Sequence, residues 1–103
     1  MTESISPASA APKPFKSSAI SFSVIIVNYN GGAYLQAAVD SLKTQTLQDF
    51  ELIVIDNAST DGSPDTLDLS GIAQARLIKN SDNVGFAVAN NQAANLARGQ
   101  WLV

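Results

Sequence analysis

Polar and aromatic side chains gather at three places in this sequence, and each place directly follows a run of apolar residues. The three places are 27–30 (Val-Asn-Tyr-Asn), Asp56-Asn57 and Lys79-Asn80. Amides donate and accept hydrogen bonds, whereas carboxylates accept them and also bind hard cations. The sequence has no His and no Cys, which excludes Ser-His-Asp and Cys-His catalysis, imidazole zinc sites and disulfide bonds. A metal bound here must therefore be a hard cation held by oxygen atoms.

The apolar runs before these places predict the strands that hold them. Continuous β-branched runs at 22–27 and 51–55 are typical of strands buried on both faces of a sheet. A shorter run at 76–78 predicts a third strand. A fourth apolar segment begins at 101–103, the last residues of the sequence.

Three helices are predicted between the strands. The first follows Asn30, a candidate N-cap, and its apolar residues recur with the period of a helix. The second is a short helix over 63–70, and the third spans 86–97 and ends at the stop signal Arg98-Gly99. Candidate caps of the second helix are Ser59, Thr60 and Asp61. The apolar stripes are Leu35, Ala38, Val39 and Leu42 in the first helix and Phe86, Ala89, Ala93 and Ala97 in the third.

The resulting order, βαβαβαβ, predicts an α/β fold with three layers and a mostly parallel sheet joined by right-handed crossovers. In such sheets ligands bind at the carboxyl ends of the strands, near a switch in strand order. That rule selects the same three places at which the polar and aromatic side chains gather.

Composition narrows the class of protein further. A chain of 103 residues with 46% hydrophobic content suits one small domain or part of a larger one. Six basic and nine acidic residues give a net charge of -3 without a basic stripe, so we expect no nucleic-acid partner. We divide the chain into a disordered tail at 1–21, rich in Ser, Ala and Pro, and a folded part at 22–103.

No signal for export or membrane insertion is visible. No apolar run approaches the roughly 18 residues of a membrane helix, and the first residues lack the pattern of a secretory signal. We therefore expect a cytoplasmic protein, and leave open whether it associates with the inner face of the membrane.

Three segments together carry a family resemblance. They are SVIIVNYN at 23–30, QTLQDFELIVIDNASTDGS at 45–63 and NSDNVGFAVANNQAANLARGQWLV at 80–103. In content and spacing they resemble successive landmarks of family 2 glycosyltransferases, which are inverting enzymes of the GT-A fold, and in particular rhamnosyltransferases. The resemblance covers 23–103 and implies the Rossmann-like, nucleotide-binding half of such an enzyme.

The resemblance also implies a nucleotide-binding site. Val27 and Tyr29 would form the floor of the pocket, with Tyr29 against a pyrimidine base, because aromatic faces stack on bases. Asp56 and Asn57 would lie at the end of the second strand, with Asn57 at the edge of the base. Many family members have two acidic residues there, so Asn57 leaves UDP-linked and dTDP-linked sugars, such as a rhamnose donor, as alternatives.

The third landmark would complete the donor pocket. The resemblance places Asn83 and Gly85 near the ribose and diphosphate, where the N–H groups of a helix N-terminus suit an anion. Simpler interpretations remain beside these: Tyr29 packs under the first helix, Asn30 caps that helix, and Asn83 caps the third.

Two functional parts of such an enzyme are absent from this sequence. After Trp101 the resemblance implies an acidic motif that binds Mg²⁺ or Mn²⁺ on the donor diphosphate, and later a carboxylate that acts as general base. The implied reaction is direct displacement, with inversion, by a hydroxyl of a saccharide or lipid-linked acceptor. We therefore predict no catalytic and no metal-binding residue in this chain, and no activity for the chain alone.

The last apolar segment bears on whether the domain is complete. A strand of three residues without a covering helix leaves an open apolar edge, so we expect a truncated domain. One alternative is a complete, non-catalytic nucleotide-binding or interaction module. Another is a structural dimer that pairs through the last strand.

Overall fold

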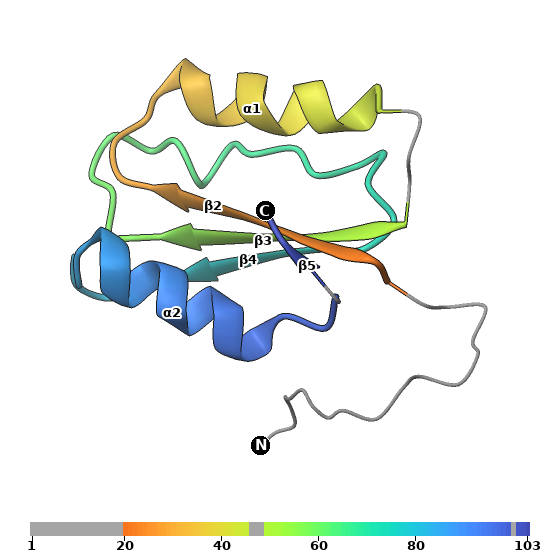
Figure 1. The fold of residues 1–103 in the computed structure, drawn as a ribbon. Coiled ribbons are helices and arrows are strands. Elements are labelled where there is room, and N and C mark those ends of the chain that lie inside the picture. Colours follow the sequence, from red (N-terminus) through yellow and green to blue (C-terminus); the bar gives the residue numbers. More distant parts are fainter. Residues whose placement is uncertain (1–19, 46–48, 100) are drawn as a thin grey trace.

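Four parallel strands form one sheet in the computed structural model, which describes residues 20–45, 49–99 and 101–103 (Figure 1). All but two residues of the predicted tail lie outside the described residues. In the sheet the strands follow the order β4-β3-β2-β5. The strands are β2 (Phe22–Asn28), β3 (Phe50–Asp56), β4 (Ala75–Lys79) and β5 (Trp101–Leu102). The prediction of a parallel α/β sheet is confirmed.

The register makes three of the strands end at one edge. Asn28 of β2 is opposite Asp56 of β3, and Asp56 is in turn opposite Lys79 of β4. The polar places that follow these strands are therefore neighbours in space, although they are 23 or more residues apart in the sequence. This edge, the carboxyl edge of the sheet, positions the candidate site.

One face of the sheet is covered by α1 (Ala33–Lys43) together with the segment 57–74 (Figure 1). Their apolar side chains form one core with the strands, and burial of this surface stabilises the layer by about 25 cal/mol per Å². The helical stripe of α1 supplies Leu35 and Val39, as its period predicts. The buried members of the cluster are Leu35, Val39, Phe50, Leu52, Val54 and Ile72.

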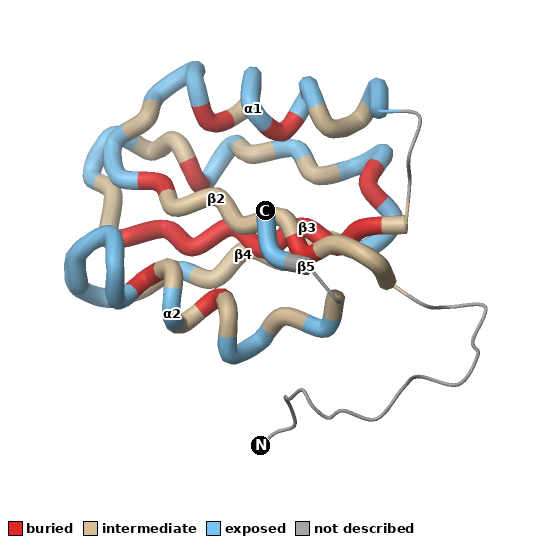
Figure 2. The backbone as a smooth tube through the Cα atoms, viewed as in Figure 1, coloured by how far each residue is buried: buried red, intermediate tan, exposed pale blue. Residues whose placement is uncertain are grey.

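The opposite face is covered by α2 (Phe86–Leu96), so the molecule has three layers (Figures 1 and 2). Ala89 and Ala93 are fully buried against Ile53 and Ile55, because small side chains let the helix lie close to the sheet. The prediction that Phe86 joins this stripe is wrong, since Phe86 is 71% exposed. It is the first residue of the helix, one turn before Ala89.

The predicted helix over 63–70 does not form. Residues 63–66 make a turn, and the segment then runs extended over 67–69 beneath α1 to a second turn at 70–71 (Figure 1). The backbone of Asp68 bonds to the side chain of Gln36 instead of to a helix: its N–H donates to Oε1, and its carbonyl accepts from Nε2. Leu67 and Leu69, two residues apart, both pack against the core of the first face. Burial of a period-two apolar pair therefore outweighs the helix signal.

The strands differ in burial more than the sequence predicts. Every residue of β3 is buried, whereas in β2 only Ser23 and Asn28 are (Figure 2). The side chains of β2 do pack against the cores on both faces, as predicted, but most of them stay half-buried. β3 lies between two strands, but the outer neighbour of β2 is β5, which has only two residues. None of the described helices has the length and apolar character needed to cross a membrane.

A buried carboxylate at the amino end of the sheet fastens the link between α2 and β5. Glu51 is 1% exposed and accepts hydrogen bonds from the Ser23 hydroxyl (2.6 Å) and from the backbone N–H of Arg98. The guanidinium groups of Arg98 and Arg76 lie 3.4 and 3.5 Å from its Oε1. Gly99 donates its N–H to the same Ser23 hydroxyl at 2.8 Å, which brings the chain back to β2 before β5 begins.

Candidate functional site

Tyr29 projects from the carboxyl edge of the sheet, directly after β2. Its side chain is 53% exposed, so it does not pack beneath α1. Val27, one residue inside the strand, is half-buried and packs with Ile53 and Ile55 beneath α2. The exposed aromatic face of Tyr29 is able to accept a flat apolar ring.

Asp56 is buried and its carboxylate is engaged within the protein. Oδ1 accepts hydrogen bonds from Asn28 Nδ2 at 2.8 Å and from Ser59 Oγ at 2.7 Å, and Oδ2 accepts from the Ser59 N–H at 3.0 Å. Charge-assisted bonds of this kind are about twice as strong as neutral ones. Asp56 therefore fixes the ends of β2 and β3 relative to each other. Its predicted contact with a nucleotide stays a prediction.

Asn30 joins two loops and does not cap α1. Its Oδ1 accepts from the N–H groups of Thr60 (2.8 Å) and Asp61 (3.2 Å), so the predicted N-cap is wrong. Asn30 has φ 52°, a left-handed conformation that Asn tolerates better than most residues. The residue before α1 is Gly32, whose N–H donates to Asp61 Oδ2 at 2.9 Å. Tyr29 is thus carried by a loop that is held on both sides.

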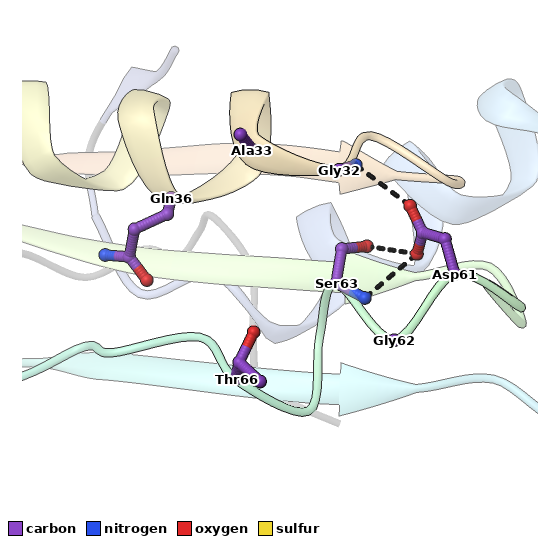
Figure 3. A pocket seen from close by; sticks show the side chains of 7 residues that line it. All are labelled: Gly32, Ala33, Gln36, Asp61, Gly62, Ser63 and Thr66. Carbon is purple, nitrogen blue, oxygen red and sulfur yellow. Dashed lines mark hydrogen bonds between the residues drawn. The ribbon is translucent and has the colours of Figure 1, made fainter.

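A shallow pocket of about 410 Å³ lies between the start of α1 and the loop after β3 (Figure 3). Figure 3 shows Asp61 reaching Gly32 on one side and Ser63 on the other. The hydrogen bonds from Ser63, and then the one from Gly32, lower the pKa of Asp61 below its ordinary value, so it is anionic at neutral pH. None of the predicted nucleotide-binding residues lines this pocket. Its lining is Gly32, Ala33, Gln36, Asp61, Gly62, Ser63 and Thr66. A negatively charged pocket does not favour a diphosphate, and we assign no ligand to it.

Asn57 lies on the α2 side of the same edge and is 2% exposed. Its Nδ2 donates to the carbonyl of Gly85 at 3.2 Å, and its Oδ1 accepts from Asn80 Nδ2 at 3.0 Å. Asn80 and Gln92 exchange two hydrogen bonds of 2.9 Å through their side-chain amides. Asn57 is therefore part of a chain of amides that joins β3, β4 and α2.

The turn before α2 holds the two remaining predicted residues. Asn83 Oδ1 accepts from the N–H of Gly85 at 2.9 Å, and Gly85 occupies the N-cap position with φ 88°. This left-handed conformation favours glycine. Asn83 thus supports the start of the helix through Gly85 instead of capping it directly. No side chain caps α2, so N–H groups of its first turn face outward from this edge.

The basic group at the end of β4 is held in an ion pair. Lys79 donates to Asp65 at 2.6 Å, and this bond raises the pKa of Lys79 above its ordinary value. Among residues 20–45, 49–99 and 101–103, no three acidic side chains come together as a group that could hold a metal ion.

Several residues of this edge were not among the predicted site residues. Asn28, Ser59 and Ser63 hold the loop after β3, and the Asn28 amide donates to both hydroxyls. Asn80 directly follows β4, so the strand-end rule already points to it. Gln92 gives no sequence signal, because an isolated Gln on a helix is ordinary.

The arrangement can now be compared with known proteins. A family model described as "Glycosyl transferase family 2" matches residues 23–103. The chain belongs to glycosyl transferase family 2. The family membership predicted from the three spaced segments is confirmed, and this family consists of enzymes.

Two curated relatives illustrate the similarity. A PGL/p-HBAD biosynthesis glycosyltransferase of Mycobacterium bovis is 38% identical over 87 residues, which are 80% of this chain and 33% of that protein. The glycosyltransferase GlyG of Streptococcus pneumoniae is 32% identical over 82 residues, which are 78% of this chain and 27% of that protein. The family 2 chain thus spans about a third or less of the length of these relatives.

A solved structure shows the same fold. The mannosyltransferase PcManGT from Pyrobaculum calidifontis, in complex with GDP-Man and Mn²⁺, superposes with a TM-score of 0.67 at 26% identity. The match covers 86% of this chain and 27% of that structure. The predicted GT-A fold is thereby confirmed.

Proposed function

We propose that this chain is the nucleotide-binding part of a glycosyltransferase that moves a sugar from a nucleoside-diphosphate donor to an acceptor hydroxyl with inversion. The observation that carries the proposal is the gathering of three predicted segments at one edge of a parallel sheet, in a chain that belongs to family 2. Ligands of parallel α/β sheets bind at this edge.

In this proposal, different residues of the carboxyl edge contact different parts of the nucleotide. Tyr29 stacks on the base above Val27, while the turn with Asn83 and Gly85 lies beside the diphosphate. N–H groups at the start of a helix favour an anion there. Asp56 and Asn57 form the wall between these two parts.

The nucleotide of the donor has three candidates, UDP, dTDP and GDP. UDP and dTDP remain the alternatives, because Asn57 stands where many family members have an acidic residue. The mannosyltransferase of similar fold was solved with GDP-Man, which adds GDP to the candidates. We propose a saccharide or lipid-linked acceptor, and a cytoplasmic location.

A divalent cation is part of the proposed reaction but not of this chain. Bound to the donor diphosphate, such a cation would neutralise charge on the leaving group. The described residues hold no group of acidic side chains that fits it, so we derive no step through it. In the whole protein we propose that the cation and the general base are held by residues other than these.

Two measurements on the full-length protein test the proposal. Titration calorimetry with UDP, dTDP and GDP, each with and without Mn²⁺, should show binding of at least one of them. Incubation of the matching sugar nucleotide with saccharide acceptors should release the nucleoside diphosphate, and NMR should show an inverted anomeric centre. Absence of binding to all three would refute the proposal. Binding without any transfer would favour the alternative of a non-catalytic nucleotide-binding module.

A further inference from the structure

Three side-chain amides form a continuous hydrogen-bond chain that ends on the turn before α2. Gln92 and Asn80 exchange two bonds, Asn80 donates to Asn57, and Asn57 donates to the carbonyl of Gly85. The partners come from the residue after β3, from the residue after β4, and from the middle of α2. We call Asn57, Asn80 and Gln92 the amide relay.

The relay has only one self-consistent direction. Both N–H groups of Asn80 are committed, one to Gln92 Oε1 and one to Asn57 Oδ1. Asn57 must therefore turn its oxygen to Asn80 and its Nδ2 to Gly85, whose carbonyl can only accept. The 2.9 Å return bond from Gln92 Nε2 to Asn80 Oδ1 fixes the orientation of Asn80 in turn.

The buried position of Asn57 indicates that the amide relay acts on Gly85. Asn57 is 2% exposed and both of its polar functions have partners within the protein. Gly85 is held from two sides, because Asn83 accepts from its N–H while Asn57 donates to its carbonyl. That carbonyl also accepts the first bond of α2, from Ala89 at 3.1 Å. The relay thus sets where the first turn of α2 begins.

We propose that Asn57, Asn80 and Gln92 are positioning residues of the nucleotide site, which hold the first turn of α2 in place for the donor diphosphate. This inference rests on the proposed function and assigns the base to Tyr29, not to the Asn57 amide. Asn80 and Gln92 touch no ligand in this arrangement and act through Asn57 and Gly85.

The substitution Asn80→Asp reverses the relay. A carboxylate at this position can only accept, so the bond from Gln92 Nε2 remains possible but the one to Asn57 Oδ1 is lost. If Asn57 turns its Nδ2 to position 80, its oxygen then opposes the Gly85 carbonyl. Either arrangement places two oxygens face to face. A second variant, Gln92→Met, has similar volume and removes both bonds to Asn80 without adding charge.

The experiment uses the full-length protein and two ligands. These are whichever of UDP, dTDP and GDP the wild type binds most tightly, and its parent nucleoside without phosphates. We expect Asn80→Asp and Gln92→Met to weaken the diphosphate about tenfold, the loss that one or two hydrogen bonds imply. Affinity for the nucleoside should stay within about twofold, because the stacking on Tyr29 is unchanged. The matched control Asn95→Asp adds the same charge at an exposed position of α2 and should match the wild type.

Other outcomes separate the two proposals. An equal loss for nucleoside and diphosphate would show that Asn57 contacts the base and would overturn the positioning role, as would unchanged affinity for both. A wild type that binds none of the three diphosphates would instead refute the proposed function. Hydrogen exchange gives a readout without ligand: the Ala89 N–H should exchange faster in Gln92→Met while amides of β3 do not. If Asn80→Asp fails to fold, Gln92→Met decides alone.

Discussion

Tyr29 and Asp56 lie at the same edge of the sheet but face different environments. The ring of Tyr29 is more than half exposed, whereas the carboxylate of Asp56 is buried under hydrogen bonds from Asn28 and Ser59. A ligand that approaches from solvent therefore meets the aromatic ring first. Substitutions of single residues should show which side chains contact the nucleotide and which only hold the loops in place.

Replacing Tyr29 should affect binding and leave folding intact. Tyr29→Ala should weaken binding of the donor nucleoside diphosphate by about 5- to 150-fold, the range of one base stacked on an aromatic ring. Tyr29→Phe keeps the ring and should remain within about threefold of the wild type. Titration calorimetry measures both. Tyr34→Ala is the matched control, since Tyr34 is 84% exposed on α1, and an equal loss there would argue against stacking on Tyr29.

Glu51 should make the stability of the protein depend on pH in acid. Burial raises the pKa of Glu51, but the hydrogen bonds from Ser23 and Arg98 and the charges of Arg98 and Arg76 outweigh it, and the pKa lies below the ordinary value of 4.5. Because the folded-state pKa is lowered, the ionised group stabilises the fold above about pH 4.5. This contribution is lost as the pH falls through that value towards the folded-state pKa.

The substitution Glu51→Gln tests this assignment. It should lower the free energy of unfolding by about 2 kcal/mol at neutral pH, because bonds to a charged group are replaced by weaker ones. The difference from the wild type should shrink as the pH falls from about 7 to about 3. Urea unfolding at several pH values measures it. Asp82→Asn removes an exposed carboxylate and serves as control; a difference that stays constant with pH would contradict the role of the Glu51 charge.

The segments that connect the strands hold the candidate site in place. The crossover from β3 to β4 is a loop that packs under α1 and bonds to it through Gln36. The crossover from β4 to β5 contains α2, which begins at the carboxyl edge and is fastened at its other end by Glu51 and Ser23. The two layers therefore reach the candidate site from opposite faces of the sheet.

The link between α2 and β5 tolerates no side chain at Gly99. A Cβ there would lie 2.6 Å from the carbonyl carbon of Phe22 and 2.7 Å from the backbone nitrogen of Ser23, and backbone atoms cannot swing aside. Gly99→Ala should destabilise the protein by about 1–3 kcal/mol, as overpacking does. Thermal unfolding measures this loss. In the control Gly62→Ala the Cβ meets open space, so only the strain of φ 78° remains, at about 1 kcal/mol. A smaller loss for Gly99→Ala than for this control would contradict the packing argument.

At the scale of the whole molecule, stability is concentrated in β3. It is buried over its full length and lies between β2 and β4, with a helical layer on each face. The edge strand β5 has two residues. Its second residue, Leu102, and the following residue, Val103, are more than half exposed. Burial, and with it the resistance to local opening, is therefore greatest in the centre of the sheet and least at the β5 edge.

Hydrogen exchange should follow this gradient. We expect amides of β3 to exchange most slowly, those of β2 and β4 faster, and those of β5 fastest among the strands, because local opening costs least where few apolar contacts are lost. Exchange followed by mass spectrometry or NMR on the full-length protein gives the order. Protection of β5 equal to that of β3 would show that another part of the protein covers this edge.

Local sequence patterns predict the strands, two of the helices and the edge of the sheet at which the strands present polar groups. A continuous apolar run identifies β3 and a period of 3.6 identifies α1, because such patterns depend only on neighbours along the chain. Gly and Asn before the helices mark the turns. The parallel direction of the strands then follows from the alternation of elements. Parallel strands end at the same edge of the sheet, which is where Tyr29 and Asp56 are expected.

Which groups bond to one another at this edge depends on how the strands and helices pack, and the local patterns do not predict it. Asn57 finds its partner Asn80 across 23 residues, and Asn30 bonds to the backbone of Asp61 across 31. Local patterns carry no information about such pairs, since strand register and helix placement bring them together. The same reason explains the segment 63–70: its residues suit a helix locally, but contact with Gln36 and with the core beneath α1 stabilises an extended path.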